Sequence, residues 1–342
     1  MFNILNEFTG YQYMLIHLAN CFGLDKLTFE ERIDWAEDAI HKDMEELAAD
    51  ADTPFTFRQA FNEIHSVRRG NPTGLLVELD ATSSFLQFMA ALSGCEKSAY
   101  ASNMIDPEVR VDAYTMLTEQ INKAMEGFTL TREQAKDLFM KSTAYGSRAI
   151  PESIFPNENL LMAYYNLMHE HYPGVMAVRQ EFLNLWDPTA MFHTCTMPDG
   201  HTFHVPVKVM YSEKLEIGEV APYNNGKPKS VTFRHAVHEP SEYSTPILAN
   251  LTQAYDAWMV RYVRQRCWNV GVELVTIHDG FRCHPEHMGI VRHCYREGMI
   301  KLAEGNYLET LVRQMTKDPK IYIHKMSLRL PELLLNSRYL LS

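Results

Sequence analysis

Residues 75–92 read LLVELDATSSFLQFMAAL, and this stretch decides how the surrounding chain is expected to fold. The preceding GNPT breaks a helical pattern, and LLVEL is typical of a short buried strand that ends at Asp80. From Ser83 onward the apolar residues recur at helical spacing, which predicts a helix that ends at Gly94. A strand end fixes a carboxylate rigidly and still exposes it, so Asp80 is a candidate metal ligand.

A second acidic residue follows the same logic near the other end of the chain. Residues 271–285 read GVELVTIHDGFRCHP, which predicts a β-hairpin with His278, Asp279 and Gly280 at its turn. Magnesium usually takes one or two carboxylates plus substrate phosphates, so Asp80 and Asp279 would suffice for a site. Taken singly, each aspartate is more often an ordinary turn or N-cap residue.

The stretch TREQAKDLFMKSTAYGS, residues 131–147, carries the third feature. Arg132 and Lys136 are four residues apart, so a helix presents both cations on one face to the same anion. Tyr145 lies near the C-terminal end of that helix, before Gly146. The alternative interpretation is a solvated basic face with a buried tyrosine.

Composition sets broad limits. Hydrophobic residues make up 46% and charged residues 22% of the chain, as in an ordinary soluble globular protein. The net charge of −11 is unfavourable for nucleic-acid binding unless the basic residues gather locally. Six cysteines without a CxxC pair indicate reduced thiols rather than disulfides or a zinc knuckle. Neither a signal peptide nor a membrane span is evident, which predicts a cytoplasmic location.

Most of the remaining chain has helical periodicity. Helices are expected within residues 11–50, with a capping box of Thr28 and Glu31, and over 54–67. Further helices are expected within 107–145, within 150–185, over 248–269 and at the C-terminal end. Between His193 and Val231 the sequence predicts short β segments. Helices and separate small hairpins together indicate an α+β protein.

These motifs resemble, in collinear order, those of the single-subunit phage and mitochondrial RNA polymerases. DATSSFLQFMAAL resembles motif A, RxxxK followed by AYGS resembles motif B, and VTIHDGF resembles motif C. YQYMLIHLANCFGLDKLTFEERIDW is similar to the segment before motif A. TMPDGHTFHVP and ELLLNSRYLLS are similar to the fingers hairpin and the C-terminal foot. The resemblance covers nearly the whole chain.

The resemblance implies a right-hand polymerase palm, a small antiparallel sheet flanked by helices, with a mainly helical fingers subdomain. The implied divisions are an N-terminal helical palm-associated segment (1–73), a first palm segment with motif A (74–125), fingers with motif B and a β-hairpin (126–240), a second palm segment with motif C (241–300) and a C-terminal helical foot (301–342).

It also implies a mechanism of nucleotidyl transfer. Asp80 and Asp279, with the carbonyl of Ala81, would bind two magnesium ions. One ion would lower the pKa of the RNA 3′-hydroxyl and the other would stabilise the leaving pyrophosphate. His278 would pack beside the catalytic aspartate near the primer terminus.

The remaining roles concern the incoming nucleotide. Arg132 and Lys136 would clamp the triphosphate. Tyr145 would sense the ribose 2′-hydroxyl, and Gly146 would allow template or nucleotide to approach the backbone. The implied partners are a DNA template, the RNA product and nucleoside triphosphates.

Three positions depart from the family pattern. Eight residues separate Lys136 from Tyr145 where the family usually has seven, which rotates a helical position by about 100° unless a local bulge absorbs it. Asn250 stands where a ribose-contacting histidine is usual, and it can still donate one hydrogen bond. Gly280 replaces a serine at the motif C turn.

Other family segments have no counterpart in the sequence. These are the promoter-reading N-terminal domain, the thumb and the early palm motif with a template-binding arginine. The arrangement resembles the larger subunit of the split, heterodimeric RNA polymerases of certain lytic podophages. A second protein subunit is therefore expected to supply the N-terminal half, in a phage-infected host cell.

Several alternatives stay open. One is a DNA polymerase or primase-like enzyme on the same palm, although Ala-Thr-Ser-Ser after Asp80 leaves room for a ribose. Others are a His-Asp metal phosphohydrolase and a non-catalytic nucleic-acid-binding subunit. A zinc site could also be drawn from four nearby side chains, although hairpin alternation puts the last two on opposite faces. These four residues are His193, Cys195, His201 and His204.

Overall fold

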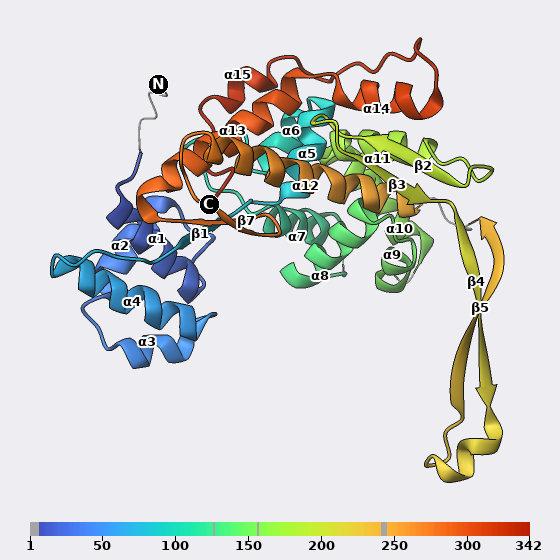
Figure 1. The fold of residues 1–342 in the computed structure, drawn as a ribbon, viewed down its shortest axis with the longest axis horizontal. Helices are drawn as coiled ribbons and strands as arrows, with labels where there is room; N and C mark the ends of the chain where they lie inside the picture. The colour runs from blue at the N-terminus through green and yellow to red at the C-terminus, as the bar shows by residue number, and fades with distance from the viewer. Residues whose placement is uncertain (1–6, 126, 156, 241–244) are drawn as a thin grey trace.

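The computed structural model describes residues 7–125, 127–155, 157–240 and 245–342, without the side chains of 208–212, 234–240 and 245. This part of the chain is mostly helical and carries three small antiparallel sheets (Figure 1). The central sheet joins strands from distant parts of the sequence, and the other two sheets are successive hairpins. The predicted α+β class is therefore confirmed at this level.

Four helices form the N-terminal part of the structure, and they pack around the first one. They are α1 (Gly10–Phe22), α2 (Phe29–Ala39), α3 (Met44–Asp50) and α4 (Pro54–Arg68). The predicted capping box at the start of α2 is present: the Glu31 carboxylate accepts a 2.8 Å hydrogen bond from the Thr28 amide. Helix α1 also contacts the first strand, so this bundle supports the sheet edge.

The central sheet joins the two predicted acidic segments. Its strands are β1 (Val77–Asp80), β6 (Val275–Ile277) and β7 (Gly280–Cys283), all antiparallel in the order β1-β7-β6. The register places Asp80 opposite Gly280, the residue that follows Asp279. Leu79 and its partner Phe281 are fully buried on one face, so alternation sends Asp80 to the open face.

Helices cover the buried face of this sheet and build the rest of the body. Helix α5 (Ser84–Ser93) follows β1 directly and ends at Gly94, as predicted, and it packs against α11 and α13. The other helices are α6 (Glu96–Ala101), α7 (Ala113–Ala124), α8 (Arg132–Phe139), the π-helix η1 (Met140–Ala144), α9 (Ala149–Ile154), α10 (Glu158–His171), α11 (Pro173–Asn184), α12 (Thr245–Trp268), the 3₁₀ helix η3 (Pro285–His287), α13 (Met288–Glu304), α14 (Tyr307–Thr316) and α15 (Leu330–Leu334). The long helix expected over 248–269 corresponds to α12. Helix α13 continues through the division expected at residue 300.

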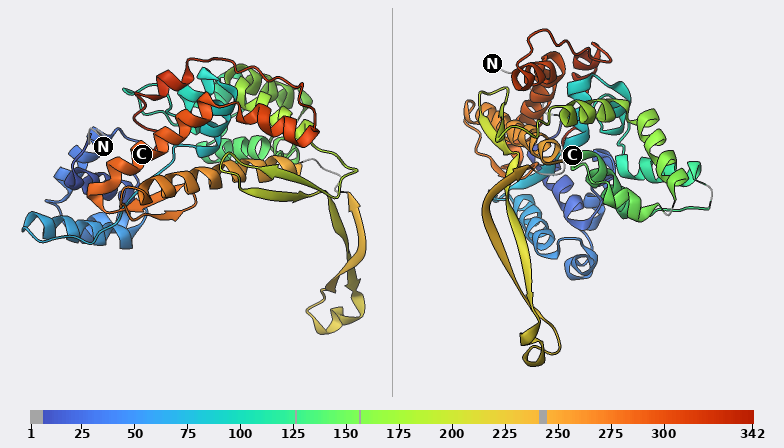
Figure 2. Two further views of the ribbon diagram at one scale, coloured as in Figure 1. Left: turned by 45° about the horizontal axis from the view of Figure 1, so that its top comes forward. Right: turned by 90° about the vertical axis from the view of Figure 1, so that its right-hand side faces the viewer.

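Two hairpins lie between α11 and α12. One is β2 (Phe192–Thr196) with β3 (Thr202–Pro206); the other is β4 (Lys208–Ile217) with β5 (Lys229–Pro240), closed by the 3₁₀ helix η2 (Gly218–Tyr223). The β4–β5 hairpin projects as a long arm from the body in every view (Figures 1 and 2). Only short β segments were expected here. The described side chains of the arm form no buried face, so its sequence lacks the alternation that marks a half-buried strand.

The C-terminal residues return to the central sheet. Leu341 forms a bridge with Ala81, and the Ser342 amide donates to the Asp80 carbonyl at 2.9 Å. The buried Gln87 amide also donates to the Leu340 carbonyl at 3.0 Å. The turn after Asp80 is thus fixed from two directions, by the last residues of the chain and by α5.

Candidate active site

A cavity of about 310 Å³ opens at the end of β1. Ala81 to Phe85 form one wall, and Asp279 from the β6–β7 turn contributes to the same site. The cavity is strongly polar, with equal numbers of carboxylates and cationic side chains. These are Asp25, Asp80, Asp112 and Asp279, with Lys26, Arg110, Arg132 and Lys136.

The two acidic segments meet through their backbones. The Ala81 amide donates to the Asp279 carbonyl at 3.3 Å, which holds the turn after β1 against the turn before β7. A Cβ atom on Gly280 would lie 2.3 Å from Asp80 Oδ1, so the glycine leaves space for the carboxylate as it is oriented here. His278 adopts a positive φ of 53°, which tightens the turn that carries Asp279.

Negative charge accumulates where these segments meet. Burial in the concave site, together with the neighbouring carboxylates of Glu78 and Asp279, raises the pKa of Asp80 to about 6. The Asp80 side chain lines the cavity and is exposed there, so a ligand that enters the cavity can reach it. On α12, burial and the charge of Asp279 likewise raise the pKa of Asp256 to about 6. The sequence had not indicated Asp256, whose position depends on the packing of α12.

This arrangement suits a divalent cation. Like charges held together are relieved by a cation, and carboxylate and carbonyl oxygens are the ligands that magnesium prefers. Among residues 7–125, 127–155, 157–240 and 245–342, no group of three or more His, Cys, Asp or Glu side chains is arranged to hold a metal. Asp80 and Asp279 supply two carboxylates at the cavity, so water and substrate phosphates would have to complete the coordination of a magnesium ion there.

The predicted basic pair also lines the cavity. Arg132 and Lys136 both lie over the ring of Tyr114, with the Arg132 Cζ 5.6 Å and the Lys136 Nζ 5.9 Å from the ring centroid. The aromatic face attracts both cations, which keeps them side by side despite their like charge. The structure thus brings Asp80, Asp279, Arg132 and Lys136 to one cavity.

A π-helix absorbs the extra residue between Lys136 and Tyr145. Helix α8 changes to the wider η1 after Phe139, and the Tyr145 amide donates to the Met140 carbonyl at 3.3 Å, five residues back. A π turn is equivalent to one residue inserted into an α-helix. A local bulge of the kind that could absorb the extra residue is thus present, and it lies beyond Lys136, whose place on the α8 face is undisturbed.

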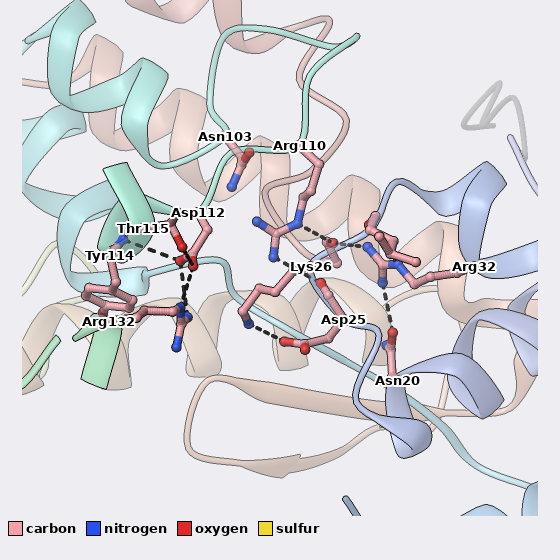
Figure 3. Close-up of polar contacts among 12 residues, drawn as sticks. Asn20, Asp25, Lys26, Arg32, Asn103, Arg110, Asp112, Tyr114, Thr115 and Arg132 are labelled. Atoms are coloured by element: carbon pink, nitrogen blue, oxygen red, sulfur yellow. Dashed lines mark hydrogen bonds and ion pairs between the residues drawn. The ribbon is translucent and has the colours of Figure 1, made fainter. Parts of the chain in front are cut away.

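Two further cations at the cavity were not indicated by the sequence. Lys26 lies in the loop between α1 and α2 and pairs with Asp25 (Figure 3). Arg110 donates to the Asp25 carbonyl at 3.2 Å and to Ser342 Oγ at 3.2 Å. Neither residue lies in a motif with helical or strand spacing. Only the fold brings the N-terminal bundle next to β1, so the sequence pattern carried no signal for them.

The other predicted site residues lie outside the lining of this cavity. Tyr145 is 41% exposed at the end of η1, and Gly146 follows with a φ of 69°. Asn250 donates to the Pro246 carbonyl of its own helix at 2.8 Å. His278 lies at the motif C turn rather than on the cavity wall. The roles assigned to these four residues stay predictions.

The histidines and cysteine of the β2–β3 hairpin have ordinary partners. The His193 ring accepts a 3.2 Å hydrogen bond from the Asp187 amide, and Cys195 Sγ contacts the Met315 sulfur at 3.6 Å. His204 lies on the exposed face and pairs with Thr194 at 3.1 Å. His193 and Cys195 thus share the buried face of the hairpin, as alternation predicts, and His204, paired with Thr194, lies on the other face.

Comparison with known proteins supports the resemblance of the motifs. Residues 6–143 match the model of the DNA-dependent RNA polymerase family. The mitochondrial DNA-directed RNA polymerase of Mus musculus is 24% identical over 90% of this chain, and that of Homo sapiens is 23% identical over 90%. T7 RNA polymerase of Escherichia phage T7 is 28% identical over 34% of the chain.

The matched regions belong to larger proteins. The chain spans 29% of the length of each of these two mitochondrial relatives, and the match to T7 RNA polymerase spans 14% of that protein. Within the described residues, no helix has both the length and the apolar character needed to cross a membrane.

Proposed function

We propose that this chain is a member of the DNA-dependent RNA polymerase family and forms the nucleotidyl-transfer centre of a DNA-directed RNA polymerase. One observation carries the proposal: the carboxylates of Asp80 and Asp279 share a cavity with the cations of Arg132 and Lys136. Carboxylates suit metal ions, and the opposing cations suit a triphosphate. The four residues come from the three motifs that the resemblance assigns to this reaction.

The acidic wall would hold two magnesium ions on Asp80, Asp279 and the Ala81 carbonyl. When bound, magnesium would supply activation of the RNA 3′-hydroxyl and stabilisation of the pyrophosphate leaving group. The protein keeps these oxygens in place through the β1–β7 pairing and the hydrogen bond between Ala81 and Asp279. Preorganised ligands lower the cost of assembling the transition state.

The basic wall would orient the triphosphate. Arg132 can bind phosphate oxygens through its planar guanidinium, and Lys136 adds a point charge from the same helix face. Lys26 approaches from the N-terminal bundle and contributes to the same cavity. These local charges offset the net charge of −11 where the substrate binds.

The small residues after Asp80 support the proposal that the substrates are ribonucleotides rather than deoxyribonucleotides. Ala81 to Ser84 present short side chains at the cavity wall and leave room for a 2′-hydroxyl. Tyr145 and Gly146 would complete the ribose and template contacts as η1 moves toward a bound nucleotide. Asn250 would contact the ribose, and His278 would pack near the primer terminus.

The proposal extends to the larger assembly. In it the central sheet is a palm, the region from α8 to the β4–β5 arm is the fingers, and the partners are DNA template, RNA and nucleoside triphosphates. A second protein subunit would complete the enzyme. Purifying the chain with and without such a subunit tests this, because robust transcription by the chain alone would contradict it.

A primer-extension assay tests the function. The full chain, with any co-purifying subunit, is given an RNA primer annealed to a DNA template, magnesium and the next nucleotide. We expect extension that disappears without magnesium and in Asp80→Asn, while Asp38→Asn at an exposed position remains active. Extension that survives in Asp80→Asn would refute the proposal. Nucleic-acid binding without extension would favour a non-catalytic subunit.

Nucleotide selection distinguishes an RNA polymerase from a DNA polymerase on the same palm. ATP should be incorporated at least about tenfold faster than dATP, a ratio that needs roughly 1.4 kcal/mol of discrimination. Tyr145→Phe should narrow the ratio, because it removes the hydroxyl assigned to ribose recognition. A wild-type preference for dATP would instead support the DNA polymerase alternative.

A further inference from the structure

Asp112 holds the guanidinium of Arg132 from a different helix. Arg132 Nε and Nη2 donate to the two Asp112 carboxylate oxygens at 2.5 and 3.2 Å, which is a bidentate pair (Figure 3). Asp112 itself caps α7: its carboxylate accepts hydrogen bonds from the Tyr114 amide at 3.3 Å and the Thr115 hydroxyl at 2.6 Å. These two hydrogen bonds therefore orient the Asp112 carboxylate independently of its contact with Arg132.

Arg132 needs such a partner because of its place in α8. It is the first helical residue after the Thr131 N-cap, where the helix dipole disfavours a cation. A free arginine at this position would turn outward to water. The Asp112 side chain is only 16% exposed, so the ion pair is partly shielded from solvent.

The third nitrogen of the guanidinium is held only weakly. Arg132 Nη1 donates to Glu133 Oε1 at 2.9 Å, but the Glu133 side chain is 75% exposed. Such a surface pair contributes little and exchanges readily with solvent or an anion. Arg132 also lines the cavity beside Lys136. A phosphate that enters the cavity can therefore replace Glu133 as the acceptor for Nη1, while Asp112 stays bound to Nε and Nη2.

We propose that Asp112 is a positioning residue: it fixes the Nε/Nη2 edge of Arg132 so that the Nη1 edge is presented to the polyphosphate of the substrate. Tyr114, two residues later, contributes the ring under Arg132 and lines the same cavity as Ser83 in the wall after Asp80. The start of α7 thereby connects the phosphate-binding wall with the acidic wall. This inference rests on the proposed function and adds a residue that acts through another.

Asp112→Asn is the informative variant. Asparagine is a good N-cap and keeps the oxygen that caps α7, but it loses the charge and one of the two acceptors for Arg132. We expect the KM for ATP to rise about tenfold, as for the loss of a charge-assisted hydrogen bond, with little change in kcat. Glu133→Gln, which removes the charge of the exposed partner of the same arginine, is the matched control and should leave KM within about twofold.

A double-mutant cycle separates positioning from mere stability. In an Arg132→Met background, Asp112→Asn should have no further effect on KM, because the residue on which it acts is gone. Asp112→Ser, which also caps a helix, should raise KM like Asp112→Asn. An unchanged KM in Asp112→Asn, or the same increase with and without Arg132, would overturn the proposal. Tighter binding of ATP to Asp112→Asn would also overturn the proposal, because Asp112 would then keep Arg132 away from the triphosphate.

Calorimetry of inorganic tripolyphosphate binding to the full chain tests the positioning role of Asp112 without relying on RNA extension. If wild type extends RNA but Asp112→Asn binds tripolyphosphate as wild type does, the positioning role is wrong and the polymerase function stands. If wild type never extends RNA but Asp112→Asn weakens tripolyphosphate binding about tenfold, the positioning role stands and the polymerase function is wrong.

Discussion

At the scale of single residues, the burial and mutual repulsion of the carboxylates in the acidic wall lower the stability of the fold until a cation binds. Asp80 lies in a concave site beside Glu78 and Asp279, and these surroundings raise its pKa to about 6. Its folded-state pKa is thus above the ordinary value of 3.8. A group of this kind favours folding below about pH 4 and loses that contribution as pH rises through about 6. A bound divalent cation reverses the penalty by favouring the charged form.

Replacing Asp80 by asparagine should therefore stabilise the metal-free protein. With a chelator present at pH 8, Asp80→Asn is expected to unfold at a higher temperature than wild type, and at pH 4 the difference should nearly vanish. Adding magnesium at pH 8 should raise the Tm of wild type and leave that of Asp80→Asn unchanged. Thermal unfolding followed by circular dichroism measures all three. A metal-free Asp80→Asn that is less stable at pH 8 would contradict the charge repulsion.

Residue types and spacing marked Asp80, Asp279, Arg132 and Lys136 as candidates, and the resemblance to a polymerase family joined them into one predicted site. The structure brings the four to one cavity. Lys26, Asp112 and Asp256 could not be predicted in this way. An aspartate before a helix has an ordinary capping role, and a lysine in a loop is usually solvated. Their contribution to the site depends on contacts between segments far apart in the chain.

At the scale of elements, the π-helix η1 lies where the spacing of motif B departs from the family pattern. Helix α8 and Tyr145 are joined by one residue more than the family pattern has, and the turn over Met140–Ala144 accommodates it. A one-residue insertion in a helix is recognisable from the sequence, but its location is not. Any turn between Lys136 and Tyr145 could have widened, and packing decided which one did.

Deleting Lys141 should convert η1 to an α-helical turn and keep the relation between Lys136 and Tyr145. Lys141 is suitable because its side chain is 44% exposed and pairs with Asp137 at the surface. Primer extension by this variant is expected to stay within about fivefold of wild type. Inserting one alanine after Lys141 should instead rotate Tyr145 by about 100° and abolish extension. If the variant without Lys141 lost activity and the variant with the inserted alanine kept it, the π turn would have another role.

Gln87 ties helix α5 to the C-terminal residues, and its loss should destabilise the fold. Its buried amide donates to Ser102 and Leu340 carbonyls at 3.2 and 3.0 Å and accepts from the Tyr295 hydroxyl at 2.7 Å. Gln87→Leu leaves the buried Tyr295 hydroxyl without its acceptor and removes one of the two donors to each carbonyl, which we expect to cost about 1–3 kcal/mol. Chemical denaturation measures the change, and Gln253→Leu at an exposed position is the control. A cost below about 1 kcal/mol would mean that water or rearrangement replaces the bonds.

At the scale of the whole molecule, the body and the β4–β5 arm are built differently. The body has a continuous core in which α5, α12 and α13 surround the sheet, whereas the arm pairs chiefly with itself. Leu215, Val231 and Phe233 are all about half exposed on the arm. Helical periodicity predicted the body well, but the exposed side chains described on the arm left no comparable signal.

Shortening the arm should therefore leave the body intact. Replacing residues 213–233 by Asn-Gly joins β4 and β5 at the paired positions 212 and 234 through a two-residue turn. The Tm of the body is expected to stay within about 3 °C of wild type, because few contacts between arm and body are lost. Differential scanning calorimetry provides the comparison. A decrease of about 10 °C would show that the arm supports the core.

The central claim is that Asp80 and Asp279, from opposite ends of the sequence, form one divalent-metal site. Manganese is a spectroscopic substitute for magnesium, and its binding to the full chain can be followed by electron paramagnetic resonance at pH 8. We expect saturable binding to wild type and to Asp38→Asn, and binding at least about tenfold weaker in Asp80→Asn and in Asp279→Asn alike. Manganese binding of wild-type strength in the double variant Asp80→Asn/Asp279→Asn would contradict it.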